Sequence, residues 1–325
     1  QAELKESAES PPLRAARLAQ DGRYHLRAAG RAYDSLANVR FATREYTDDL
    51  WFAAENYYQG QTYTHAARML EMYLHHEPER RNAAVFLRLG QSYLTLGETE
   101  KAIRALEQCI TMHPRDLAVY QARLECVRAY RQMDRNDEAE ALLLENINGD
   151  ELTPKSPEWR DSLFELGEIQ HETGRFEQAF KTLEEAVIRY PDAPQALMAR
   201  YTIARSFHNA AQVPAKKVRL AKTENERQKN RKLRDENLQG ALDNYKLVQR
   251  MLTLQDHGES HVLKQHLLRN CYMMQGSVLF QLRRYEEARK AYANGSTLFQ
   301  SEPFVLESFV HIANCWRRLD EPMNA

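Results

Sequence analysis

Residues 159–191 read WRDSLFELGEIQHETGRFEQAFKTLEEAVIRYP, which predicts two short amphipathic helices joined by a turn at Thr173-Gly174-Arg175. Apolar and small residues recur at helical spacing in both halves, at Leu163, Leu166, Gly167 and Gln170 and then at Phe176, Ala179, Leu183, Ala186 and Ile188. Pro191 ends the second helix because it lacks a backbone donor. One such hairpin cannot bury its own apolar faces, so further copies must stack beside it.

The same spacing recurs along the chain. An apolar or small residue is followed twelve positions later by alanine in the pairs Ala54 and Ala66, Gly90 and Ala102, Val127 and Ala139, Gly167 and Ala179, and Gly276 and Ala288. A bulky residue follows the first member by three positions (Tyr57, Tyr93, Tyr130, Phe207, Leu279, Trp316), and another follows the alanine by four (Leu70, Leu106, Leu143, Leu183, Tyr292). These residues predict one packing column in each hairpin.

Two stretches carry a family resemblance, LRLGQSYLTLGETEKAIRALEQCITMHP (87–114) and LFELGEIQHETGRFEQAFKTLEEAVIRYP (163–191). They resemble tetratricopeptide repeats, whose Leu-Gly, aromatic, Ala, large apolar and Pro positions occur here in order. The resemblance implies an all-α, right-handed superhelical solenoid of helix-turn-helix repeats from about Thr47 to the C-terminus. Val127 departs from the family pattern because it is large where glycine is usual, and Asn146 and Gln275 are polar at expected apolar or small sites.

The spacing divides the chain into an N-terminal segment and a repeat array. Residues 1–46 are expected to form a degenerate hairpin or cap, and 47–325 the array, with approximate repeats at 47–80, 83–116, 120–153, 160–193, 197–255, 261–302 and a truncated 306–325. In the fifth repeat Ala204 meets its alanine at Ala241, 37 positions later instead of 12, which leaves 25 extra residues. This insert, 213–237, is rich in Lys and Arg, and we expect it to be an elongated, solvated helix.

Composition excludes several classes of protein. The chain of 325 residues has 43% apolar residues and a net charge of −1, which gives no global field for nucleic acid or an anionic membrane. No apolar run approaches the roughly 20 residues that span a bilayer. The four cysteines, Cys109, Cys126, Cys271 and Cys315, form no CxxC pair and are expected to be reduced structural thiols.

The first helix of each repeat is expected to line the concave side of the solenoid. Residues three before, one after and four after each small residue share a stripe that the second helix does not cover. We predict a groove for a peptide or helix of a protein partner, lined by Trp51, Glu55, Tyr58, Leu87, Gln91, Leu124, Arg128, Arg131, Phe164, Glu168, His171, Tyr201, Arg205 and His208. The alternative is that the apolar members pack between successive first helices.

The family's carboxylate-binding version uses asparagine just after the small residue, where this chain has Glu55, Gln91, Arg128 and Glu168. A clamp for a chaperone tail is therefore not expected. The insert offers a possible electrostatic docking element for an acidic partner, comprising Lys216, Lys217, Arg219, Lys222, Arg231 and Lys232. Nucleic acid is a less favoured ligand because the insert lacks interleaved aromatic residues for base stacking.

No catalytic motif is present, and we expect a non-enzymatic scaffold without a cofactor or metal. Arg189 to Ala193, with Ala199, Tyr201, Ile203 and Ala204, resembles the repeat subclass of bacterial cell-envelope assembly proteins. A role in outer-membrane assembly is therefore an alternative, and both the cell envelope or periplasm and the cytoplasm stay open as compartments. A metal-dependent enzyme using His257, His261 and His266 is a remote alternative.

Overall fold

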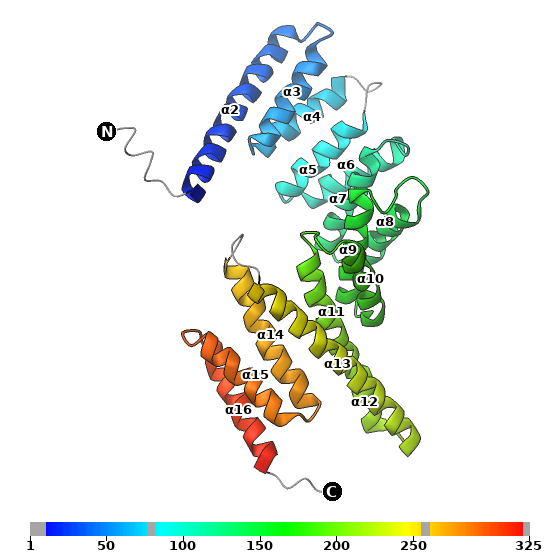
Figure 1. Ribbon diagram of the computed structural model, residues 1–325. Coiled ribbons are helices and arrows are strands. Elements are labelled where there is room, and N and C mark those ends of the chain that lie inside the picture. Colours follow the sequence, from blue (N-terminus) through cyan, green and yellow to red (C-terminus); the bar gives the residue numbers. More distant parts are fainter. Residues whose placement is uncertain (1–10, 77–81, 255–260, 321–325) are drawn as a thin grey trace, which may run out of the picture. The chain divides into compact units, whose positions relative to one another are not determined.

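The computed structural model describes residues 11–76, 82–254 and 261–320, apart from the side chains of 11, 12, 261 and 320, and within these ranges it contains helices and no strand. The chain forms two compact units, Gln1–Trp159 and Arg160–Ala325. The first contains α2 (Pro11–Arg40), α3 (Tyr46–Gln59), α4 (Tyr63–His76), α5 (Ala83–Thr95), α6 (Thr99–Met112), α7 (Ala118–Gln132) and α8 (Asn136–Asn148) (Figure 1). The all-α prediction is confirmed.

The second unit begins within α9 (Pro157–Glu172). It continues through α10 (Phe176–Arg189), α11 (Ala196–Ala210), α12 (Gln212–Leu220), α13 (Glu224–Leu254), α14 (His261–Gln281), α15 (Tyr285–Leu298) and α16 (Phe304–Asp320). In both units most consecutive helices pack against each other as antiparallel hairpins, whereas α12 directly continues α11 after Ala211 and α11 packs against α13. α6 ends before Pro114 and α10 before Pro191, as the prolines predict, whereas Pro78 lies outside the described residues.

The hairpin turns share one backbone geometry. Seven positions after the small residue of the first helix, the backbone has a positive φ, at Gln61, Gly97, Asp134, Gly174 and Arg283. The N–H of the next residue then donates to the carbonyl five residues back, over 2.8–2.9 Å in each turn. This Schellman-type ending satisfies a last carbonyl of the first helix and reverses the chain. Glycine at Gly97 and Gly174 adopts this backbone without the strain that a side chain adds.

A large side chain of the second helix fits against a small residue of the first. A Cβ added to Gly90 would lie 2.4 Å from the Leu106 side chain, and one added to Gly167 would lie 2.4 Å from that of Leu183. In the α14–α15 hairpin, a Cβ added to Gly276 would lie 2.5 Å from the ring of Tyr292. The second-helix alanines are fully buried, at Ala66, Ala102, Ala139, Ala179, Ala241 and Ala288. The column predicted from the spacing is therefore present, and its small members accommodate large partners.

Two residues predicted to pack inside the hairpins are exposed, Trp316 (48%), whose ring instead meets the Arg289 guanidinium at 4.7 Å, and Ile188. Ile188 is 78% exposed, and its neighbour Val187 is buried beside Ala186. The reason is helical geometry, because each residue turns the side chain by about 100°, which carries position 188 well away from the face that Leu183 occupies.

The described part of the N-terminal segment contains one long helix. α2 runs without interruption from Pro11 to Arg40 and packs along α3, so these residues form no hairpin, and of the two predicted alternatives α2 fits the cap. Gly30 provides the close approach, since a Cβ there would lie 2.7 Å from the ring of Tyr57. Arg27 Nε also donates to the carbonyl of Gly60 over 2.6 Å. α2 thus covers the side of α3 that, in the later first helices, is covered by the preceding repeat.

The insert forms a helical hairpin in place of the single elongated helix expected. α12 occupies its first part and the beginning of α13 the second, and the two helices pack together. Thr223 and Glu226 start α13 with reciprocal bonds, because the Glu226 N–H donates to Thr223 Oγ1 (3.2 Å) and the Thr223 N–H to Glu226 Oε2 (3.4 Å). The C-terminal half of α13 then serves as the second helix of the α11 repeat.

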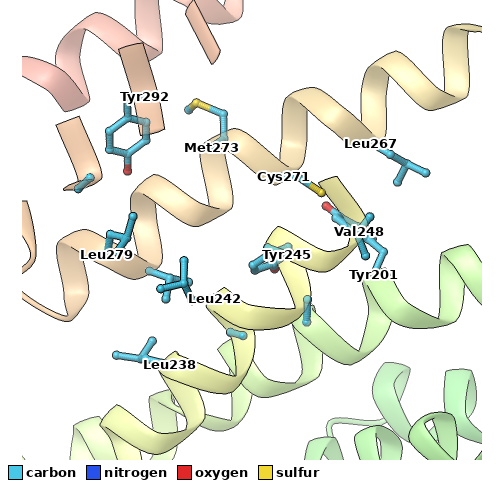
Figure 2. Packing of buried hydrophobic residues seen from close by; sticks show 14 of the residues in the cluster. Tyr201, Leu238, Leu242, Tyr245, Val248, Leu267, Cys271, Met273, Leu279 and Tyr292 are labelled. Carbon is cyan, nitrogen blue, oxygen red and sulfur yellow. The ribbon is translucent and has the colours of Figure 1, made fainter. Parts of the chain in front are cut away.

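The core of the second unit is continuous across the interrupted repeat. Leu238, Leu242, Tyr245 and Val248 of α13 are buried against α11 and α14, where Cys271 joins the same cluster (Figure 2). All four cysteines of the chain are buried and unpaired, and burial raises the pKa of the Cys109, Cys126 and Cys271 thiols to about 12. They pack as small apolar side chains, as the sequence indicates.

The two polar departures from the repeat pattern have partners. Asn146 is fully buried, its Nδ2 donates to the carbonyl of Tyr120 over 3.2 Å, and its Oδ1 accepts from Arg123 Nη1 over 3.2 Å. Gln275 donates to Gln249 Oε1 over 2.5 Å. A buried polar group costs little once it is hydrogen-bonded, so the hairpins keep their packing at both positions.

Hydrogen bonds also join first helices of neighbouring hairpins. In the second unit Gln195 Nε2 donates to Asp161 Oδ1 over 3.0 Å, and Thr202 Oγ1 donates to Glu168 Oε2 over 3.3 Å. The ring of buried His171 lies 2.8 Å through Nδ1 from Ser206 Oγ. The Ser206 hydroxyl donates its hydrogen to the carbonyl of Thr202 (2.8 Å). Ser206 Oγ must therefore accept the bond from His171, whose Nδ1 carries the proton.

Gly167→Ala tests the small-against-large contact. We expect it to lower the free energy of unfolding by about 1–3 kcal/mol, because the new methyl group overpacks against Leu183 and this outweighs the better helix propensity of alanine. Gly22→Ala is the matched control, since a Cβ at Gly22 has no neighbour within 4 Å, and it should stabilise by up to about 1 kcal/mol. Urea unfolding measures both changes. Equal effects of the two substitutions would contradict the packing column.

The buried histidine makes stability depend on pH. Burial, with a smaller effect of Arg205, lowers the pKa of His171 from 6.5 to about 4. The unfolded chain therefore binds more protons between these values, so the stabilisation is complete above pH 6.5 and is lost as the pH falls toward 4. At pH 5 the protonation of this group alone should lower the free energy of unfolding by about 2 kcal/mol relative to neutral pH.

His171→Leu should reduce the loss of stability between pH 7.5 and pH 5 by that amount in urea unfolding. His266→Leu, at an exposed histidine of the same unit, is the matched control for replacing a histidine by leucine. An identical pH dependence in the wild type and the His171 variant would show that His171 is not held neutral by its surroundings.

Candidate partner-binding surfaces

The predicted groove residues lie on α3, α5 and α7 in the first unit and on α9 and α11 in the second. The structure divides them by burial. Less than a tenth of the surface remains exposed at Leu87, Gln91, Leu124, Phe164, His171 and Tyr201. Trp51, Glu55, Tyr58, Arg131, Glu168 and His208 are partly exposed, and Arg128 and Arg205 are exposed. The apolar row is therefore mostly packed between helices, and the surface left for a partner is polar and aromatic.

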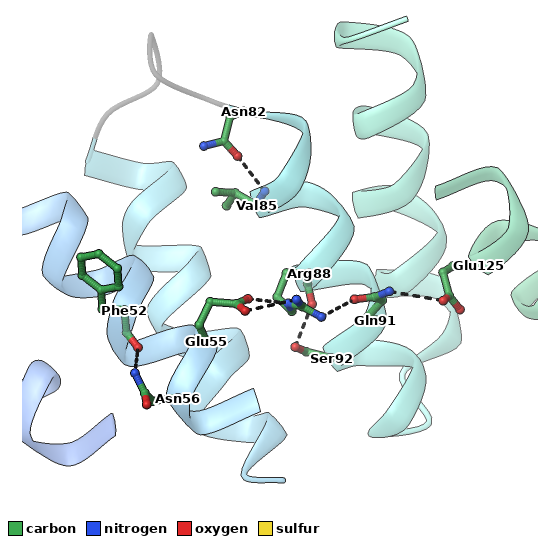
Figure 3. Close-up of polar contacts among 9 residues, drawn as sticks. All are labelled: Phe52, Glu55, Asn56, Asn82, Val85, Arg88, Gln91, Ser92 and Glu125. Atoms are coloured by element: carbon green, nitrogen blue, oxygen red, sulfur yellow. Dashed lines mark hydrogen bonds and ion pairs between the residues drawn. The ribbon is translucent and has the colours of Figure 1, made fainter. Parts of the chain in front are cut away.

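A chain of charged and amide groups crosses the first helices of the first unit (Figure 3). Arg88 donates to both carboxylate oxygens of Glu55, over 2.5 and 3.1 Å, and its Nη1 donates to Gln91 Oε1 over 2.8 Å. Gln91 Nε2 donates to Glu125 Oε1 over 3.3 Å, and Arg128 Nη1 reaches Glu125 Oε2 over 2.9 Å. These five residues, the α3–α5–α7 polar chain, connect three successive repeats.

An aromatic side chain completes this surface. The guanidinium of Arg88 lies 4.2 Å from the centroid of the Tyr58 ring, and Tyr63 meets the same ring edge-on at 5.3 Å. Burial raises the pKa of the Tyr58 phenol, so the hydroxyl is protonated at neutral pH. Bidentate pairing and stacking together fix the plane of the guanidinium. Tyr58 and the polar chain therefore form a pre-ordered surface.

Arg88 was not among the predicted residues. Its contact with Glu55 joins positions 33 apart, slightly less than one repeat, and Arg269 and Glu302 repeat this separation at 2.5 Å in the second unit. The signal that would have found it is therefore a pair of opposite charges 33 residues apart, the first on one first helix and the second on, or just before, the next.

The first helices of the second unit enclose a hollow. It has a volume of about 430 Å³ and is lined by Phe164, Glu165, Glu168, Pro194, Gln195, Met198 and Ala199. Met198 is its accessible apolar side chain, 40% exposed, whereas Phe164 forms the floor at 3%. Two carboxylates stand at the rim, and the hollow brings together two of the predicted residues.

The remaining predicted residues of α11 do not share that hollow. Tyr201 packs edge-on against Tyr245 with ring centroids 5.8 Å apart, which assigns it to the core. His208 Nε2 lies 2.8 Å from Gln281 Nε2 of α14, and burial lowers the pKa of its ring. Arg205 is exposed on the same helix.

The six predicted docking cations of the insert are exposed, five of them on α12 and α13 and Lys222 in the turn between these helices. Lys232 is 3.9 Å from the Glu236 carboxylate. The other predicted docking residues, Lys216, Lys217, Arg219, Lys222 and Arg231, show no ion pair among the described residues. The structure brings this group together on one hairpin, apart from the first-helix residues of α9.

Within the described ranges no three His, Cys, Asp or Glu side chains are grouped so as to hold a metal ion. His257 and the side chain of His261 lie outside those ranges, so the histidine hypothesis is not tested. Among the helices described, none is both long and apolar enough to cross a bilayer.

Comparison with known proteins connects these repeats to one family. Tetratricopeptide-repeat models match residues 83–126, 124–194 and 270–297. A search of curated proteins gave no significant match. Among solved structures, the C-terminal part of a TPR repeat-containing protein from Cytophaga hutchinsonii superposes with a TM-score of 0.60 at 12% identity, over 90% of this chain and 98% of that one.

PilF from Pseudomonas aeruginosa gives a TM-score of 0.51 at 14% identity, over 81% of this chain and 96% of that one. At such identity the likeness shows the fold alone, so the cell-envelope role and the compartment stay predictions. The prediction of a tetratricopeptide solenoid is confirmed, and repeats of this kind support a protein-interaction scaffold in general terms. The family matches and the fold together show that this chain contains tetratricopeptide repeats, within residues 83–194 and 270–297, in an all-α array of the same kind.

Proposed function

We propose that this protein is a non-enzymatic scaffold that binds a peptide or helix of a protein partner along the first helices of its repeats. The observation that carries the proposal is the α3–α5–α7 polar chain with Tyr58. Its groups are already oriented by one another, so a partner need not bear the entropy of ordering them. Carboxylates and guanidinium groups alternate along it, which favours a partner segment with both charges and polar groups in matching register.

The hollow between α9 and α11 supports a second contact on the same kind of face. Met198 and the floor at Phe164 offer apolar area for one large side chain, and the carboxylates of Glu165 and Glu168 favour a basic or hydroxyl-bearing neighbour. An apolar anchor flanked by polar groups is the usual arrangement for peptide recognition, because burial supplies affinity and the rim supplies register.

Charge reversal at the polar chain tests the first contact. A partner is first identified by affinity capture from the source organism with mass spectrometry and then purified. Arg128→Glu should weaken its binding at least tenfold in calorimetry, because a carboxylate would then face Glu125 and repel the group that Arg128 binds.

Arg104→Glu is the matched control, since Arg104 is a comparably exposed arginine of the same unit on the second helix α6. It should leave the affinity unchanged. Circular dichroism melting should be similar for both variants. Equal affinity for Arg128→Glu and the wild type would exclude this surface as the binding site.

Phe164→Ala should act on folding. Its ring is 3% exposed and lies 6.3 Å from the Tyr190 ring, so truncation should lower the free energy of unfolding by about 3–5 kcal/mol. Met198→Ala, at the accessible side of the hollow, should cost less than about 1 kcal/mol and instead weaken binding of the partner. Urea unfolding and calorimetry of the two variants separate these roles. A stable Phe164→Ala protein with lost binding would assign the ring to the partner surface.

A further inference from the structure

A second cleft lies where the insert meets the turn of the preceding repeat. It has a volume of about 370 Å³ and is formed by the α9–α10 turn, the first residues of α10, the end of α11, and both helices of the insert. The lining residues are Gly174, Arg175, Phe176, Glu177, Gln178, Ala210, Val213, Pro214, Lys217, Asn230 and Leu233. None of these residues belongs to the predicted first-helix groove. We call this site the insert cleft.

The insert cleft has an apolar interior. Ala210 and Pro214 are buried, and Phe176 is partly buried beside them. Val213 of α12 and Leu233 of α13 remain 54% and 42% exposed, although both line the same cavity. Two aliphatic side chains held at the mouth of a cavity leave apolar surface that a ligand side chain can cover. The volume suits one or two large side chains.

The insert that forms one side of the cleft is strongly cationic. Residues 213–237 contain nine Lys and Arg against four Asp and Glu, a net charge of 9 − 4 = +5, whereas the whole chain has −1, so the rest carries −6. All four acids have partners, because Glu224 binds Arg227 (2.6 Å), Asp235 binds Arg234, Glu236 binds Lys232 and Glu226 caps α13.

The six other cations show no ion pair among the described residues, at Lys216, Lys217, Arg219, Lys222, Lys229 and Arg231. Lys217 lines the cleft itself, and Arg175 stands on the opposite side with Glu177 as the one acid of the lining. The excess positive charge therefore lies on the insert hairpin, and Lys217 brings part of it to the cleft.

We propose that the insert cleft binds an acidic segment of a protein partner through a large apolar side chain, with Lys217 and the neighbouring insert cations contacting the flanking carboxylates. Charge complementarity selects the acidic segment, and the apolar interior selects its anchor. This site is separate from the first-helix surface and does not depend on the function proposed for it.

The same observations favour a peptide over nucleic acid. Residues 213–237 contain no Phe, Tyr or Trp, so the insert has no ring on which successive bases could stack. Of the exposed lining side chains of the insert, Val213 and Leu233 are aliphatic and Lys217 is a cation. A carboxylate-rich peptide with an aliphatic or aromatic anchor matches both the aliphatic side chains and Lys217, whereas an oligonucleotide would match only the cations.

Fluorescence anisotropy with the full chain and defined labelled probes tests the proposal. The main probe is an acidic peptide of Asp and Glu around a central Leu-Phe pair, and the comparison peptide has Ser-Ser in place of that pair. We expect the first to bind at least tenfold more tightly, the factor that one buried apolar side chain supplies. Its affinity should fall as salt rises from 50 to 500 mM, because part of the attraction is between exposed charges.

Variants assign the binding to the cleft. The pair Val213→Ser with Leu233→Ser should remove the preference for the Leu-Phe peptide, and Lys217→Glu should weaken both peptides. The controls are Leu254→Ser, an 82% exposed leucine at the end of the same helix, and Lys246→Glu, an exposed lysine of α13 outside the cleft. Neither control should change the affinity. Circular dichroism should show unchanged helical content throughout.

Three results would overturn the proposal. Equal affinity for the two acidic peptides would reduce the site to a charged surface without an anchor. Tighter binding of an oligothymidylate probe than of the Leu-Phe peptide would assign the insert to nucleic acid. Unchanged peptide binding by the Val213 and Leu233 double variant would place the peptide elsewhere. Arg128→Glu should retain full peptide affinity, so failure of the first-helix proposal and failure of this one are distinguishable.

Discussion

The α5–α6, α9–α10 and α14–α15 hairpins depend on one contact, a large side chain of the second helix packed against a glycine of the first. Leu106 meets Gly90, and Leu183 meets Gly167, at a distance where even a methyl group would not fit. This contact sets how closely the two helices approach, and therefore which other side chains can interlock. The positive-φ turn seven residues after the small residue returns the chain at the matching height, so local backbone geometry and side-chain packing specify the same hairpin.

Stacking of the hairpins uses a different kind of contact. Hydrogen bonds and ion pairs such as Arg88 with Glu55, and His171 with Ser206, join first helices one repeat apart. Exposed ion pairs contribute little to stability, but partly buried bidentate ones fix side-chain orientation. The bonds that align neighbouring repeats therefore also orient the polar side chains on the face that would meet a partner. Most apolar residues of that face are buried between the aligned helices.

The insert changes one repeat without interrupting its core. α13 is long enough to provide both the second helix of the insert hairpin and the second helix of the α11 repeat. Ala241 and Tyr245 are therefore buried at the positions that the alanine and the large residue occupy in the other second helices. The extra hairpin adds a concentration of positive charge and, where it meets the preceding turn, an apolar cavity. A repeat protein can acquire a second surface in this way, since each repeat contacts only its neighbours.

The sequence by itself determined the helices, the hairpin turns and the small-and-large columns, because these follow from spacings within about forty residues that recur along the chain. It could not determine which members of the first-helix row face solvent. Leu87, Phe164 and Tyr201 share the helical stripe of Trp51 and Glu55, yet burial depends on how the neighbouring repeat sits beside each one. The continuity of α2, the folding of the insert on itself and the pairing of Arg88 with Glu55 were likewise decided only by the tertiary structure. The physical reason is that helical periodicity is local, whereas burial, charge pairing and cavities are set by residues brought together from separate elements.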